Sequence, residues 1–228
     1  MAAESVRRSD AEIQYEVRGA LYADRRVISD NVVVDVRQGV VTLGGSVPSA
    51  DQRQVARRIA ERIKGVREVV DDLTVIPLAP RQDADVTADV VTALTLDSLV
   101  DEDKIEVTTV DGVVYLRGTV GSYTERKAAD DDARSIAGVL DVVDELVVAP
   151  AVVHGDEQLA RDIRRQVEES LRIDPASLSV EVRHGVAYLR GLVPSLTLRW
   201  IVDELARWTP GITDVVNELQ VAPPTKAA

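Results

Sequence analysis

The sequence predicts an α+β protein made of three tandem domains, each with two helices covering a small three-stranded mixed sheet. A glycine-bounded motif recurs at residues 39–45, 112–118 and 185–191, always 73 residues apart. Apolar residues four apart precede each copy, as in an amphipathic helix. Alternating apolar residues flank each copy, as in half-buried strands. The expected domains span residues 10–78, 83–150 and 156–223.

Each domain is expected to open with a helix that starts near an aspartate. Asp10, Asp83 and Asp156 share one phase of the repeat, and each carboxylate is expected to accept from the free amides of the first helical turn. Ser9 and Glu12 have the spacing of a capping box. The core-facing stripe is expected to comprise Ile13, Val17 and Leu21, then Val86, Val90 and Leu94, then Leu159, Ile163 and Val167.

A hairpin is expected next. Apolar residues alternate over 32–36, 105–109 and 178–182, which predicts a strand with one buried face. Each strand runs into a glycine turn, and Asp111-Gly112 is the strongest hairpin signal of the three. The repeated motif then pairs back antiparallel.

A second helix and a third strand complete each domain. The helices are expected to begin after serine caps and to end before a glycine in the left-handed conformation. The third strand should lie parallel to the second, because a helix joins the two. The caps are Ser49, Ser122 and Ser195, and the glycines are Gly65, Gly138 and Gly211.

A polar residue interrupts the third strand at one phase in all three domains, as Asp71, Asp144 and Asn217. We expect these side chains to hydrogen-bond nearby backbone, as short polar side chains commonly do. A shared ligand role is the alternative.

Composition excludes several classes of protein. The 228 residues contain no cysteine, which rules out disulfides, thiol catalysis and thiolate metal sites. The net charge is −12, and residues 83–155 alone carry 16 acidic and 5 basic side chains, so nucleic acid is not an expected partner. The start of the chain has no signal-peptide core, and no stretch is apolar enough to span a bilayer. A cytoplasmic location is expected, with peripheral attachment at the inner membrane as a variant.

Candidate catalytic groups are few. His154 and His184 fall in a linker and in a hairpin turn, where both are expected to face solvent. No spacing of metal ligands, no phosphate-binding glycine loop and no nucleophile turn is present. The prediction is a protein that is not an enzyme and has no cofactor and no metal site.

The second helix of the first domain is basic on one side. Its arginines and lysine are expected to project outward, opposite the core-facing residues of the helix. Such a face would meet lipid phosphates through charge-assisted hydrogen bonds; docking on the acidic middle domain or plain solvation are the alternatives. The residues are Arg53, Arg57, Arg58, Arg62 and Lys64.

The same helix of the third domain carries Trp200 and Trp208 at phases held by Gln54 and Arg62 in the first domain. Both tryptophans are therefore expected to face outward. Exposed tryptophans suit a membrane interface or a protein contact. Packing between domains or a dimer seam is the alternative.

The middle domain has an acidic run, Asp130-Asp131-Asp132, in its second helix. Asp132 occupies a phase that should face the core, held by Ile59 and Leu205 in the other domains. A solvated face is one interpretation. The other is a weak site for K⁺ or Ca²⁺, to which the segment 101–103 would add charge.

The ordered set of motifs resembles the BON domain, in three copies over nearly the whole chain. The resemblance implies a non-catalytic bacterial binding module, associated with phospholipids or cell-envelope surfaces and often with stress tolerance. The matching residues are Gly112–Gly118 with Ser122, Glu125 and Arg126, and Gly65-Val66 with Val69, Asp71 and Leu73.

The predicted function is thus a non-enzymatic, stress-associated binding protein for anionic phospholipid or a membrane surface. The arginine face, Trp200 and Trp208 are its proposed binding residues. A scaffold that binds a protein partner or itself, and a cation-responsive module, are the alternatives.

Overall fold

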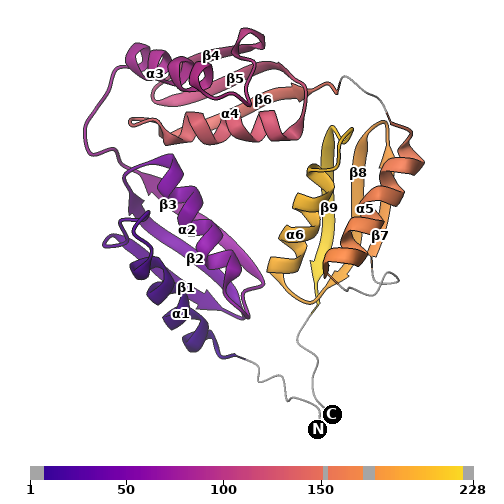
Figure 1. Cartoon of the computed structure of the whole chain (residues 1–228). Coiled ribbons are helices and arrows are strands. Elements are labelled where there is room, and N and C mark those ends of the chain that lie inside the picture. The colour runs from indigo at the N-terminus through magenta and orange to yellow at the C-terminus, as the bar shows by residue number, and fades with distance from the viewer. Residues whose placement is uncertain (1–7, 151–153, 172–177, 223–228) are drawn as a thin grey trace.

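The computed structural model describes residues 8–150, 154–171 and 178–222. It shows three domains with the same order of helix, strand, strand, helix and strand (Figure 1). The α+β fold class is therefore confirmed. The expected last residue of the third domain, 223, lies outside the described residues.

The first domain comprises α1 (Asp10–Ala23), β1 (Val32–Arg37), β2 (Val40–Val47), α2 (Ala50–Arg62) and β3 (Glu68–Val75). The second comprises α3 (Asp83–Leu96), a 3₁₀ turn η1 (Glu102–Lys104), β4 (Ile105–Val110), β5 (Val113–Val120), α4 (Tyr123–Ser135) and β6 (Asp141–Val148). The third comprises α5 (Asp156–Leu171), β7 (Leu178–Arg183), β8 (Val186–Val193), α6 (Leu196–Arg207) and β9 (Asp214–Val221).

Each domain has a mixed sheet with its second strand in the centre. In the first domain β2 pairs antiparallel with β1 and parallel with β3, as expected from the helix that joins β2 to β3. Both helices cover one face of the sheet (Figure 1). The predicted helix stripe Ile13, Val17 and Leu21 is fully buried there against β-strand residues such as Val41 and Leu43.

The aspartates that open the first helices do not cap them, which corrects the expectation. Asp10 is the first residue of α1, and Ser9 is the N-cap, in a complete capping box with Glu12. The Asp10 carboxylate instead accepts from the backbone amides of Gln38 (2.7 Å) and Gly39 (2.9 Å), in the β1–β2 turn. Asp83 and Asp156 bind the other two turns in the same way.

These bonds have a local cause. The turn residues Gln38 and Gly39 both have positive φ, which aims two successive amides at one point, and a carboxylate is a suitable acceptor for such a pair. The equivalent bonds from His184 and Gly185 hold the pKa of Asp156 below its usual value. Each first helix is therefore tied to the far end of its hairpin.

The polar residue of the third strand bonds nearby backbone, as predicted. One side-chain oxygen of Asp71, Asp144 and Asn217 accepts from the amide two residues on. The other oxygen of Asp71 pairs with Arg53 (3.0 Å), and that of Asp144 with Arg126 (2.7 Å).

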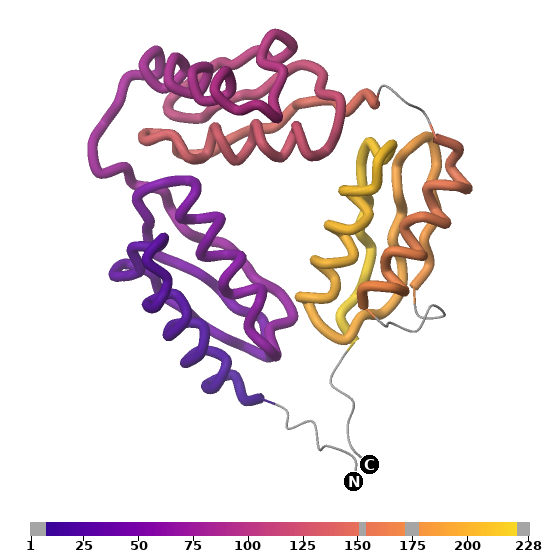
Figure 2. The backbone as a smooth tube through the Cα atoms, viewed as in Figure 1, coloured from indigo at the N-terminus to yellow at the C-terminus, as the bar shows by residue number. Residues whose placement is uncertain are grey.

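The three domains form a ring in which the second helices α2, α4 and α6 face the centre (Figures 1 and 2). The first residue of each second helix contacts the next domain around the ring. Ala50 packs in the core cluster of the second domain, and Leu196 packs in that of the first. Tyr123 meets Trp208 of the third domain edge to face, with ring centroids 6.3 Å apart. Burial raises the pKa of Tyr123 to about 12.

Candidate functional site: a basic cavity between the three domains

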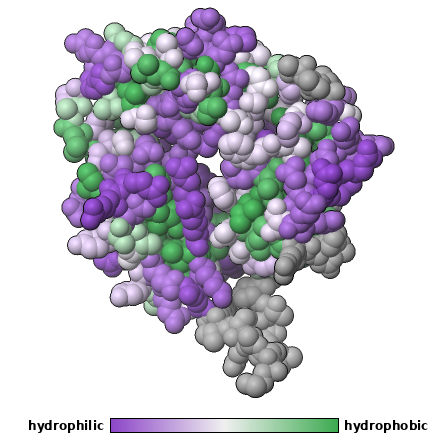
Figure 3. All heavy atoms as spheres, in the orientation of Figure 1, coloured by the Kyte–Doolittle hydropathy of each residue, from purple (hydrophilic) through white to green (hydrophobic). Residues whose placement is uncertain are grey.

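A cavity of about 480 Å³ lies between the three second helices. Figure 3 shows the molecule hollowed at its centre. The first domain supplies most of the wall through α2, while α4 contributes Lys127 and α6 contributes Trp200 and Glu204. The residues lining this central cavity are Arg26, Gln54, Val55, Arg57, Arg58, Ile59, Glu61, Arg62, Lys127, Trp200 and Glu204.

Helix α2 points its basic residues into the cavity because its opposite side is apolar. Val55, Ala56 and Ala60 are buried in the core of the first domain, which leaves Arg57, Arg58 and other basic residues on the inner side of the ring.

The arginines differ in their partners. Arg57 pairs with Glu61 at 3.0 Å. Among the described residues, Arg58 and Arg62 form no ion pair with a carboxylate. The guanidinium of Arg62 lies 5.9 Å from the ring centroid of Trp200, within cation–π range. These two arginines therefore keep their charge available to a ligand.

Five basic and two acidic side chains line the cavity; because Arg26 pairs with Asp24 and Arg57 with Glu61, the excess positive charge comes from Arg58 and Arg62. Lys127 pairs with Asp131 along α4, and Glu204 accepts from the indole nitrogen of Trp208 at 2.6 Å. Clefts lined by one sign of charge raise the local concentration of counter-ions. An anion with several oxygens suits this set of donors.

The structure places four of the seven predicted site residues at the cavity: Arg57, Arg58, Arg62 and Trp200. The other three lie outside it. Arg53 is paired with Asp71 and lies 3.8 Å from Asp141 of the second domain. Lys64 is exposed beyond the end of α2, and Trp208 packs on Tyr123.

Both tryptophans are partly exposed, at 38% for Trp200 and 48% for Trp208, so the expectation that they face outward from their own domain holds. Each also contacts a neighbouring domain, in agreement with the alternative of packing between domains. Sequence reasoning missed Lys127 and Arg26, because the cavity exists only once the domains are assembled.

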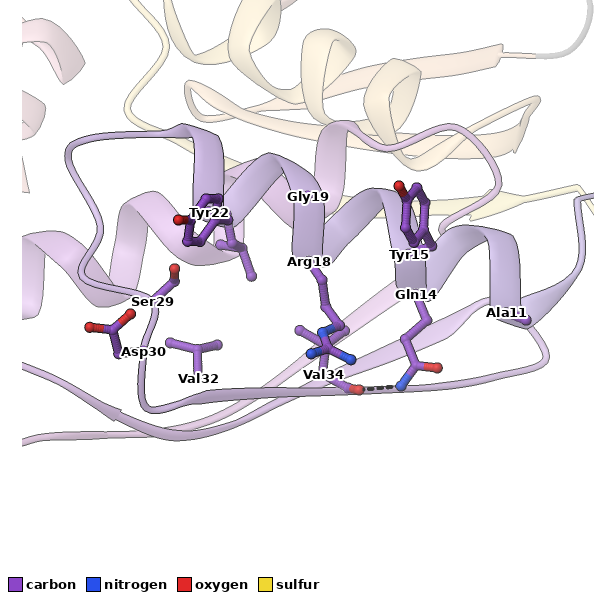
Figure 4. Close-up of a pocket in the computed structure, with 11 residues that line it drawn as sticks. Ala11, Gln14, Tyr15, Arg18, Gly19, Tyr22, Ser29, Asp30, Val32 and Val34 are labelled. Atoms are coloured by element: carbon purple, nitrogen blue, oxygen red, sulfur yellow. Dashed lines mark hydrogen bonds between the residues drawn. The ribbon is translucent and has the colours of Figure 1, made fainter.

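A second hollow of about 710 Å³ runs between α1 and β1 (Figure 4). Tyr15 and Tyr22 stand on its rim with over 80% of their surface exposed. Gln14 donates to the carbonyl of Val34 at 2.6 Å, which occupies one acceptor of the edge strand. Such cover reduces unwanted pairing at a sheet edge. Its charged lining is one arginine, Arg18, and one aspartate, Asp30, so it concentrates no charge of one sign.

Comparison with known proteins agrees with the repeat. The family profile described as BON domain matches residues 9–77, 82–150 and 155–223. The chain belongs to the BON domain family. The three αββαβ units are thus BON domains, and the resemblance expected from the sequence is confirmed.

The chain is similar to several curated bacterial proteins. It is 32% identical over 143 residues to "Osmotically-inducible protein Y" of Escherichia coli. The aligned region covers 60% of this chain and 71% of that protein. It is 30% identical over 139 residues to "Outer membrane lipoprotein DolP" of Haemophilus influenzae, covering 59% and 72%. An uncharacterised protein of Anaplasma centrale is 28% identical over 141 residues, covering 59% and 91%.

The acidic run of the second BON domain is divided between different environments. Asp130 is buried and bonded to Arg134, and Asp131 pairs with Lys127. Asp132 is half-buried, and its Oδ2 is enclosed without a hydrogen-bond partner among the described residues. Over the same residues, no group of three or more His, Cys, Asp or Glu could hold a metal ion.

The half-buried Asp132 is expected to make the stability of the second BON domain depend on pH. Burial first, and then the charges of Asp97 and Asp131, raise the pKa of Asp132 to about 6 from 3.8. Because the folded state holds the proton of Asp132 more tightly than the unfolded state does, protonation of this carboxyl stabilises the fold. This contribution is complete below pH 3.8, the pKa of an unperturbed Asp, and is lost as the pH rises through 6.

We expect Asp132→Asn to raise the free energy of unfolding at pH 7.5 by about 1 kcal/mol, since solvent screening reduces the full value of the shift. The gain should disappear at pH 4. Urea unfolding of both proteins at the two pH values measures the difference, and a gain equal at both pH values would contradict the assignment to ionisation.

The two histidines have different settings. His184 is exposed in its hairpin turn, as expected. His154 is half-buried beside Tyr123 and Trp208, in a small hollow between the second and third BON domains. The expectation that His154 faces solvent was therefore wrong, because residues of the second and third domains surround its side chain. None of the helices in the described ranges is both long and apolar enough to cross a membrane.

Proposed function

We propose that this protein is a non-enzymatic binding protein of the bacterial cell envelope, which binds the phosphate headgroup of an anionic phospholipid in the central cavity. The observation that carries the proposal is the pair Arg58 and Arg62, whose charges are unpaired by carboxylates within the described residues and point into a cavity with an excess of basic groups. Arginine binds phosphate oxygens through several parallel hydrogen bonds.

The other walls of the cavity fit a lipid headgroup. Trp200 supplies an aromatic surface of the kind found where apolar and polar environments meet. The half-buried Ile59 adds apolar surface beside the arginines. The cavity volume of about 480 Å³ suits a headgroup and the glycerol that carries it.

The relatives support an envelope and stress setting. One is named as an outer membrane lipoprotein and another as osmotically inducible. They give no support to the expected cytoplasmic location, and we therefore place the proposed function at the envelope. The BON domain assignment is in keeping with a binding role without catalysis.

The double variant Arg58→Gln/Arg62→Gln is expected to lose at least tenfold in affinity for vesicles that contain phosphatidylglycerol, because two charge-assisted contacts disappear. Cosedimentation with anionic and with neutral vesicles measures the change. Neutral vesicles should bind neither protein.

A matched control is available in Arg37→Gln/Arg161→Gln, which removes the same charge at exposed positions away from the cavity. The control should bind anionic vesicles as the natural protein does. Equal losses in both double variants would show that net charge, and not the cavity, governs binding. No binding by the natural protein to either vesicle would remove the proposal.

A further inference from the structure

The central cavity is lined by residues of all three BON domains, so a ligand bound there would contact each domain. Its lining comes from all three, with Arg58 and Arg62 on the first, Lys127 on the second and Trp200 on the third. A ligand that touches all of these groups can do so only when the ring is closed. The ligand therefore has a higher affinity for the closed ring than for an open one.

The direct contacts between the domains are sparse beside the core of each domain. The first and second domains meet at Ala50 and through Arg53 and Asp141, whose charged atoms are 3.8 Å apart. The first and third meet at Leu196 and Val221 and through Thr197, which donates to the carbonyl of Glu61 at 3.4 Å. The second and third meet where the ring of Tyr123 packs against Trp208 and Arg207. Half-exposed ion pairs contribute little free energy, and small interfaces within a chain permit domain motion.

Arg58 and Arg62 of α2 line the closed cavity without a carboxylate partner among the described residues. Closure adds Lys127 of α4, whose ammonium pairs with Asp131, and Trp200 of α6 to the same lining. An anion beside the two arginines reaches these further groups only in the closed ring, so its attraction to the protein is stronger there.

The geometry points to a coupling between anion binding and domain closure: a phosphate-bearing ligand in the central cavity holds the three BON domains in the closed ring. The inference rests on the proposed role of the cavity as a phosphate site. The ligand chemistry is a phosphate group with several free oxygens, carried by a lipid headgroup or present as a free anion. The protein would then open and close according to the supply of that group.

Distances between spin labels test the coupling in the full chain. The sequence has no cysteine, so pairs of introduced cysteines are the only labelling sites. Asp72→Cys with Ser179→Cys reports on the first and third domains, and Asp72→Cys with Glu106→Cys on the first and second; all three positions are exposed. Pulsed electron resonance then gives the distance distribution with chloride, pyrophosphate or phosphatidylglycerol vesicles at matched ionic strength.

The expected result is a broad distribution in chloride that narrows with pyrophosphate or with anionic vesicles. In Arg58→Gln/Arg62→Gln the concentration needed should rise at least tenfold, and in Arg37→Gln/Arg161→Gln it should stay unchanged. A single narrow distribution in chloride, or a narrowing that does not depend on Arg58 and Arg62, would overturn the inference.

The two proposals fail separately. Arginine-dependent binding to vesicles with unchanged distances would remove the coupling and leave the phospholipid site. Narrowing by pyrophosphate without binding to vesicles would remove the phospholipid and leave a coupling driven by a free phosphate anion.

Discussion

Gly45→Ala is expected to destabilise the first BON domain by about 3 kcal/mol or more. Gly45 lies in β2 with φ of +95°, a conformation that a residue with a side chain rarely adopts. A Cβ placed there would lie 1.9 Å from the carbonyl oxygen of Asn31. That oxygen belongs to the backbone and accepts a hydrogen bond from the amide of Ser46. It therefore cannot move aside without breaking this bond at the start of β1.

The neighbouring residue supplies the control. Gly44 has open space where a Cβ would be added, and its φ is not in the left-handed region. Gly44→Ala should therefore leave the free energy of unfolding within about 0.5 kcal/mol of the natural value. Urea unfolding followed by circular dichroism measures both variants. If Gly44→Ala and Gly45→Ala lowered the free energy of unfolding by similar amounts, the positive φ of Gly45 and its contact with Asn31 would not be the cause of the destabilisation.

Leu196→Asp is expected to open the ring without unfolding any domain. Leu196 is 9% exposed and packs in the core cluster of the first domain, although it belongs to the third. An aspartate there would bury an unpaired charge, a cost that separation of the two domains avoids. Helix α6 itself should persist, because an aspartate suits the first residue of a helix.

Small-angle X-ray scattering is expected to show a larger radius of gyration for Leu196→Asp, with an unchanged circular dichroism spectrum. Affinity for phosphatidylglycerol vesicles should fall at least tenfold, since Trp200 leaves the cavity with α6. Leu192→Asp is the control, because Leu192 is 52% exposed in β8. An unchanged radius for Leu196→Asp would mean that other contacts hold the first and third domains together.

Most of each BON domain could be predicted from the sequence because its signals are local. The stripe of Val86, Val90 and Leu94 repeats with helical period, and the pair Asp111-Gly112 marks a hairpin within four residues. Asp71 and Asp144 accept hydrogen bonds from amides two residues further along the chain, and such local partners can be predicted from sequence. Signals of this kind depend on backbone geometry that neighbouring residues determine.

The errors arose where partners are far apart in sequence. Asp10 has two sets of amides within reach, and it binds the turn 28 residues away while Ser9 takes the helix. The assembly of the ring was not predictable from a pattern either. Ala50, Tyr123 and Leu196 hold the same position of the repeat and the same place between domains, yet their side chains range from a methyl group to a phenol ring, so no common residue type marks the contact.

The arrangement of these three residues has a consequence for the number of repeats. Each unit presents a different surface at its leading and trailing ends, so the contact between units has a direction. A directional contact between like units either returns to its origin after a set number of units or continues without end. Here three units return to the origin. Loss of one repeat would leave two unmatched surfaces, and an additional repeat would have no position in the circuit.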